Sequence, residues 1–142
     1  MSDKNFEFFE NGLTQKDYKR LKKWGSLEED VFNHYKMFLG RITDTLIRSV
    51  FNYPLCEHIT QKDFDGETAH FYKMRVAISN PKMSPSCGAR LIFAILLQKR
   101  KFVPILAYGA FEEGQFYSIN GKMHPLKKSG LIKIIDEKLK TL

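Results

Sequence analysis

The side chains in this chain best suited to chemistry are cations and tyrosines in its second half. Lys73 and Arg75 alternate along one segment, Arg90 lies at the start of an apolar segment, and Tyr108 and Tyr117 come later. Lys and Arg side chains neutralise phosphates and release counterions, so a surface of this kind binds nucleic acid in a salt-dependent way. The set therefore predicts a face that meets a polyanion.

The net charge of the chain supports this interpretation because it is uneven. Residues 1–65 hold ten Lys and Arg against eleven Asp and Glu, whereas residues 66–142 hold thirteen against five. The second part thus has a net charge of +8 and the first part −1, which together give the overall +7. A basic part beside a neutral one favours RNA as the partner. The alternatives are an acidic protein partner and a surface whose lysines only keep the chain in solution.

Other chemistries lack their motifs in this sequence. The four histidines are scattered without metal-ligand spacing, and the two cysteines, Cys56 and Cys87, form no CxxC pair. No GxGxxG, Walker or GxSxG motif is present. We therefore expect no metal, no cofactor and no disulfide framework.

The composition indicates one folded domain over residues 1–142. Hydrophobic residues make up 43% of the chain and aromatic residues 13%, well above the values of disordered chains. The first ten residues lack an apolar signal stretch, and the longest purely apolar run, 91–97, is too short to span a bilayer. We expect a cytoplasmic protein that does not engage a membrane.

The first half predicts one strand and two helices. The aromatic segment 5–10 predicts a strand, which ends at an Asn-Gly turn. Residues 15–24 predict a helix, and a capping box at Ser26 to Glu29 begins a longer helix that reaches about residue 51. The two helices would form a hairpin. Residues 54–66 show no period, which indicates a connecting loop with at most a short extended piece.

The second half predicts a sheet followed by a helix. Residues 68–78 alternate in polarity, and 88–97 form the apolar run expected of a central strand covered on both faces. Residues 102–108 predict a further strand, in which Pro104 indicates either a strand at the margin of the sheet or a bulge. Residues 79–87 are expected to form a loop. A short strand at 115–119, an Asn-Gly turn and an amphipathic helix at 129–142 complete the order, which indicates an α+β fold: a small antiparallel sheet, a helical hairpin on one face and a C-terminal helix.

Three segments of this order carry a resemblance to a known family. They read NFEFFENGLTQKDYKRLKKWGS, then FYKMRV followed by GARLIFAI, and then FVPILAYG followed by EEGQFYS. The chain resembles the RelE/ParE superfamily of bacterial toxins, and RelE-type mRNA interferases in particular. The resemblance covers residues 5–118 with gaps, so that 119–142 would be a C-terminal extension.

The resemblance implies roles for four side chains. Lys73 and Arg75 match the strand cations that hold mRNA near the cleaved bond, and Arg90 matches the arginine that contacts the scissile phosphate. Tyr117 matches the tyrosine that acts on the attacking 2′-hydroxyl. The implied reaction is a transesterification without a metal, for which nearby cations would have to lower the tyrosine pKa from its usual value of about 10.

The sequence departs from the family after Gly109, where the interferases usually have a second cation. Here Ala110 and Phe111 are followed by Glu112 and Glu113, either of which could serve as a base instead. Further candidate RNA contacts are Lys99, Arg100, Lys101, Lys122 and His124. Of these, Lys122 and His124 could replace the missing cation, whereas the run at 99–101 is also typical of a solvated turn.

The function that the resemblance implies is a ribosome-associated endoribonuclease toxin, neutralised by a cognate antitoxin protein that covers the basic face. One alternative is a protein of the same fold that inhibits a target, such as DNA gyrase, without catalysis. The other is an RNA-binding protein without toxicity.

Overall fold

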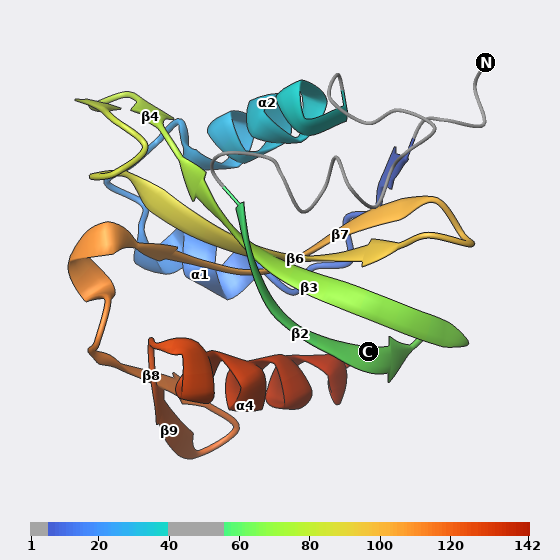
Figure 1. The fold of residues 1–142 in the computed structure, drawn as a ribbon. Coiled ribbons are helices and arrows are strands. Elements are labelled where there is room, and N and C mark those ends of the chain that lie inside the picture. Colours follow the sequence, from blue (N-terminus) through green and yellow to red (C-terminus); the bar gives the residue numbers. More distant parts are fainter. Residues whose placement is uncertain (1–5, 40–55) are drawn as a thin grey trace.

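The computed structural model describes residues 6–39 and 56–142, and a five-stranded sheet lies at its centre (Figure 1). The strands follow the order β1-β7-β6-β3-β2 across the sheet. Their bounds are Glu7–Phe8 for β1, Cys56–Phe64 for β2, Glu67–Val76 for β3, Ala89–Leu96 for β6 and Lys101–Gly109 for β7. Strand β1 runs parallel to β7, while the other neighbours are antiparallel. The predicted α+β class is confirmed, but the sheet is mixed rather than wholly antiparallel.

Helices cover both faces of this sheet (Figure 1). Helix α2 (Leu27–Leu39) packs on one face and helix α4 (Lys128–Leu139) on the other. The apolar side chains of β3 and β6 alternate between the two cores, as the two-residue period of a strand requires. Tyr72 and Phe93 lie in the core under α2, whereas Phe71 and Ile92 lie in the core over α4.

The short helix α1 (Gln15–Arg20) lies against an edge of the sheet. Strand β1 pairs with β7 only at Lys101 and Phe102. Further along β7, Oδ2 of Asp17 accepts a hydrogen bond from the Ala107 N–H at 3.1 Å, and Arg20 donates to the Ala107 carbonyl at 3.0 Å. Helix α1 therefore satisfies backbone groups of the β7 edge, and the predicted hairpin of two helices over one face is not confirmed.

Strands β6 and β7 test two predictions from the sequence. All eight residues of β6 are buried, so the predicted central strand is confirmed. In the β6–β7 pairing, Ile92 is opposite Leu106 while Phe93 is opposite Pro104, so Ile105 is an extra residue on β7. Pro104 therefore marks a bulge, one of its two predicted meanings. Its other predicted meaning, a strand at the margin of the sheet, also fits this position, because among the described residues β1 pairs with β7 only at Lys101 and Phe102 and so leaves Pro104 without a strand on that side.

The loop predicted at 54–66 is wrong for residues 56–64, which form β2. Within the described residues this strand pairs only with β3, at the outside of the sheet, and Ile59 is its one fully buried residue. A largely polar sequence suits a strand in that position, and this is why the hydrophobic period failed to indicate it. The long helix predicted from residue 26 is confirmed over α2, and its remainder lies outside the described residues.

Two small hairpins flank the sheet. The predicted loop 79–87 contains β5 (Lys82–Met83), which pairs with β4 (Ile78–Ser79). The predicted strand at 115–119 is β8 (Phe116–Ile119), and it pairs with β9 (Lys122–Pro125), which the sequence did not indicate. Asn120 and Gly121 connect them with φ values of 51° and 75°, so the predicted turn is confirmed as one with two left-handed residues.

None of the helices in the described part of the chain has the length and apolar character needed to cross a membrane.

Candidate nucleic-acid interface

The register of the sheet brings two of the predicted cations together. Arg75 on β3 is directly opposite Arg90 on β6, and Arg90 is opposite Tyr108 on β7. Lys73 lies two residues before Arg75 and therefore on the same face. This face also carries Phe71 and so is the one that α4 covers further along the strands. We call Lys73, Arg75, Arg90 and Tyr108 the cation row.

Arg90 is only 4% exposed, and its guanidinium is largely occupied. It donates to the carbonyls of Pro85 at 2.9 Å, Ser86 at 3.1 Å and Ala89 at 3.3 Å. The same group contacts Oε1 of Glu113 at 3.4 Å, while Nε has no hydrogen-bond partner among the described residues. Arg90 thus holds the loop before β6 in place through these carbonyls. It also contacts one carboxylate, that of Glu113.

That carboxylate, Glu113, contacts two of the three cations in the row, Arg90 and Lys73. Its Oε2 lies 3.7 Å from Nζ of Lys73, which also pairs with Glu57 at 3.4 Å. The Glu113 side chain is 40% exposed, so it is accessible from solvent although two cations flank it. Arg75 is exposed, and within residues 6–39 and 56–142 it forms no ion pair. Among the described residues, the row therefore presents one cation without an ion pair, Arg75, beside one exposed carboxylate, Glu113.

Tyr108 contributes a buried hydroxyl to the row. Its side chain is fully buried, and the hydroxyl oxygen has no hydrogen-bond partner within the described residues. Burial raises the pKa of Tyr108, and the negative charge of Glu113 raises it further. The hydroxyl therefore remains protonated at neutral pH.

Tyr117 belongs to a second, buried cluster. Its hydroxyl donates to Oδ1 of Asp17 at 2.5 Å, and Asp17 also pairs with Arg20 at 2.8 Å and with Lys138 at 3.1 Å. Burial raises the pKa of Tyr117, and the charge of Asp17 raises it further. This environment is the reverse of the one expected from the sequence, in which cations would lower the tyrosine pKa. The cluster was missed because nothing near Asp17 in the sequence indicates a partner one hundred residues away.

Glu112 and Glu113 occupy different environments although they are neighbours. Glu112 accepts two hydrogen bonds from Arg20, each at 3.1 Å, and a third from the Gly109 N–H at 2.9 Å. Glu112 therefore stabilises the turn after β7 and connects this turn to α1 by hydrogen bonds. Of the two glutamates proposed from the sequence as a base, only Glu113 contacts the cation row.

The other candidate RNA contacts lie away from the row. In the β6–β7 hairpin, Lys101 is opposite Leu96 and Arg90 is opposite Tyr108. Six residues of strand, about 20 Å, therefore separate the cationic turn at 99–101 from Arg90. Within that turn, Lys99 pairs with Asp65 at 3.0 Å.

Lys122 and His124 lie on β9 rather than after β7. Lys122 pairs with Glu137 of α4 at 3.1 Å, and His124 is opposite Tyr117 in the β8–β9 hairpin. Lys122 is thus held against α4 and His124 lies opposite Tyr117, so neither takes the place of the cation missing after Gly109.

The part of the chain that the structure describes contains no group of three His, Cys, Asp or Glu side chains that could hold a metal ion. Comparisons with protein-family models, with curated proteins and with solved structures found no match to this chain.

Proposed function

We propose that this chain is the toxin of a type II toxin-antitoxin system and that it cleaves mRNA on the ribosome without a metal. The observation that carries the proposal is the position of Glu113, an exposed carboxylate 3.4 Å from Arg90 and 3.7 Å from Lys73. A base beside several cations is what cleavage of an RNA phosphodiester requires. The basic second half of the chain and the resemblance to RelE-type interferases support the same function.

The proposed reaction is a transesterification. Glu113 takes the proton of a ribose 2′-hydroxyl, and the 2′-oxygen attacks the adjacent phosphorus. Arg75 and Arg90 stabilise the negative charge that develops on the phosphate oxygens. The bond to the 5′-oxygen breaks, and the Lys73 ammonium protonates that oxygen. The products are a 2′,3′-cyclic phosphate and a 5′-hydroxyl end.

Glu113 takes the role of base that the resemblance gave to Tyr117. A base must be deprotonated and accessible, and a carboxylate meets the first condition at neutral pH. Glu113 meets the second because it is 40% exposed. The Tyr117 hydroxyl is buried and bound to Asp17, and its raised pKa keeps it protonated.

The cation row also suggests how the activity is inhibited. Arg75 is exposed and Lys73 is half-buried, and we propose that a cognate antitoxin protein covers these side chains in the cytoplasm. The antitoxin would compete with RNA for the same side chains.

The test is inducible expression of the chain followed by mapping of mRNA 5′ ends. The unaltered chain should produce cuts in phase with codons, and Glu113→Gln should reduce them by about a hundredfold to ten-thousandfold, the usual contribution of a positioned base. Glu28→Gln, an exposed carboxylate on α2, is the matched control. Undiminished cutting by Glu113→Gln would exclude this residue as the base, and an unaltered chain that leaves mRNA intact would exclude the nuclease.

A second candidate is a non-catalytic inhibitor with a RelE/ParE-like fold, for example of DNA gyrase. Two observations favour it. Most of the hydrogen bonds that Arg90 donates go to backbone carbonyls, and the residues directly after Gly109 include no cation. Growth arrest with intact mRNA and lost supercoiling would identify this function. RNA binding without any effect on growth would instead identify an RNA-binding protein that is not a toxin.

A further inference from the structure

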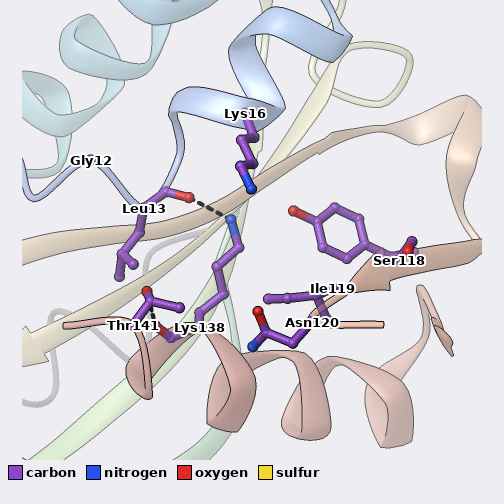
Figure 2. A pocket seen from close by; sticks show the side chains of 9 residues that line it. Gly12, Leu13, Lys16, Ser118, Ile119, Asn120, Lys138 and Thr141 are labelled. Atoms are coloured by element: carbon purple, nitrogen blue, oxygen red, sulfur yellow. Dashed lines mark hydrogen bonds between the residues drawn. The ribbon is translucent and has the colours of Figure 1, made fainter. Parts of the chain in front are cut away.

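A cavity of about 380 Å³ opens between the start of α1, strand β8 and the end of α4 (Figure 2). It lies at the second cluster, and none of the cation row lines it. The residues around it are Gly12, Leu13, Lys16, Tyr117, Ser118, Ile119, Asn120, Lys138 and Thr141. Its volume falls within the range of small-molecule sites, which is about 300 to 1,000 Å³.

Lys138 is the buried cation of this cavity. Only 5% of the residue is exposed, and its ammonium donates to the Leu13 carbonyl and to Oδ2 of Asp17. An ammonium has three donors, so one remains beyond these two bonds. A lysine is rarely buried to this extent unless its charge is paired.

Asp17 alone does not neutralise the charge around it. The same carboxylate pairs with Arg20 at 2.8 Å and accepts hydrogen bonds from the Tyr117 hydroxyl and the Ala107 N–H. Arg20 also pairs with Glu112 at 3.1 Å, so Asp17 and Glu112 together balance Arg20 and Lys138, and within the described residues Lys16 is the cation of this opening without a carboxylate partner. Burial lowers the pKa of Lys138, the carboxylate of Asp17 raises it, and the positive charges of Arg20 and Lys16 lower it further.

Lys16 adds a second ammonium to the same opening. Figure 2 shows its side chain extending from α1 towards the Lys138 ammonium. Lys16 is exposed, and no carboxylate of the described residues forms an ion pair with it. Two like charges that face one opening repel each other, and an anion between them would remove that repulsion.

We infer that this cavity binds a phosphate monoester group, held by the ammonium groups of Lys16 and Lys138. A phosphate monoester carries close to two negative charges at neutral pH, which matches two converging ammonium groups. The exposed Ser118 hydroxyl and the Asn120 side chain provide further polar contacts for the rest of the ligand. The ligand is either a free phosphorylated metabolite or the 5′-phosphate end of an RNA, and the inference does not depend on the proposed nuclease function.

The test is calorimetric titration of the whole chain at constant ionic strength. The probes are inorganic phosphate, ribose 5-phosphate, and one short RNA with either a 5′-phosphate or a 5′-hydroxyl end. We expect the phosphate monoesters to bind and Lys16→Glu to weaken the binding by about tenfold or more, equivalent to about 1.4 kcal/mol. Lys19→Glu is the matched control, because it makes the same charge change on α1 at an exposed residue outside the lining.

Stronger binding of ribose 5-phosphate would identify a metabolite site, and a preference for the RNA with a 5′-phosphate would identify an RNA-end site. Absence of binding by inorganic phosphate and ribose 5-phosphate, together with equal binding of the two RNAs, would overturn the inference, because RNA bound at the cation row needs no 5′-phosphate. An equal loss in Lys16→Glu and Lys19→Glu would also overturn it, because it would indicate a diffuse effect of charge. Lys138→Met should abolish phosphate binding, and its melting temperature is measured in parallel. If this variant does not fold, the result for Lys16→Glu alone tests the inference.

Discussion

The Tyr117 hydroxyl and Oδ1 of Asp17 are joined by a 2.5 Å hydrogen bond between residues one hundred positions apart. Asp17 is fully buried and accepts from four donors, which come from α1, β7, β8 and α4. A buried carboxylate is tolerated only where it is paired and hydrogen-bonded. One of these donors, Lys138 of α4, belongs to residues 119–142, so Asp17 joins this C-terminal extension to the first helix and the extension is an integral part of the fold.

Removal of either partner should reveal the cost of an unpaired buried group. We expect Tyr117→Phe to lower the free energy of unfolding by about 1–3 kcal/mol, because Asp17 loses a donor. Asp17→Ala should cost more, about 3–5 kcal/mol, because Lys138 then remains buried without its partner. Urea unfolding followed by circular dichroism measures both, with the exposed Ser118→Ala as control. A smaller loss for Asp17→Ala than for Tyr117→Phe would contradict this account.

The buried tyrosines predict that the free energy of unfolding decreases at alkaline pH. Burial raises the pKa of Tyr18, Tyr72, Tyr108 and Tyr117 above the usual value of about 10. Above that pH the folded chain holds more protons on these groups than the unfolded chain does, so the free energy of unfolding falls as the pH rises. The lowered pKa of Lys138 acts in the opposite direction, but only up to the pKa of an unfolded lysine, about 10.4.

Absorbance at 295 nm, which reports tyrosinate, tests this prediction between pH 9 and pH 12. The native chain should ionise only a minority of its six tyrosines before it unfolds. Reversible ionisation of all six near pH 10, with the circular dichroism spectrum unchanged, would contradict the burial described above.

Gly130 on α4 should not tolerate a larger residue. A Cβ atom at this position would lie 1.8 Å from the Pro125 carbonyl oxygen, so the helix and the end of β9 approach too closely for any side chain. Glycine to alanine inside a helix usually stabilises it by about 1 kcal/mol. Here we expect Gly130→Ala to destabilise the chain by about 1–3 kcal/mol, as overpacking does.

Gly25→Ala is the control for this substitution, because a Cβ atom there meets nothing within 4 Å. The two melting temperatures should differ clearly. An unchanged melting temperature for Gly130→Ala would show that α4 can move away from Pro125.

Arg75 is the cation of the row that should report RNA contact most directly, because it is exposed and forms no ion pair with the described residues. We expect Arg75→Ala to weaken binding of a short single-stranded RNA and to reduce the slope of log K against log salt by about 0.7, the value for one phosphate contact. Lys133→Ala removes an exposed cation from α4 and is the control. Equal slopes for Arg75→Ala and the unaltered chain would remove Arg75 from the interface.

The parts of the fold that the sequence predicted are those with a strong local pattern. The apolar run of β6, the period of α4 and the bulge at Pro104 all followed from neighbouring residues. Strand β2 did not, because an outer strand with one fully buried residue has no hydrophobic period to detect. The alternation along β3 placed Lys73 and Arg75 on one face, but the pairing of Tyr117 with Asp17 depends on tertiary contacts that no local pattern encodes.

The contact of α1 with Ala107 also affects how the chain avoids aggregation. An uncovered sheet margin is a template on which a strand of another molecule can add, and this is a route to fibrils. Strand β1 covers β7 only at its start, so the hydrogen bonds of Asp17 and Arg20 to Ala107 occupy backbone groups that another molecule could otherwise pair with. Detachment of α1 would therefore expose backbone groups of an apolar strand to pairing with another molecule.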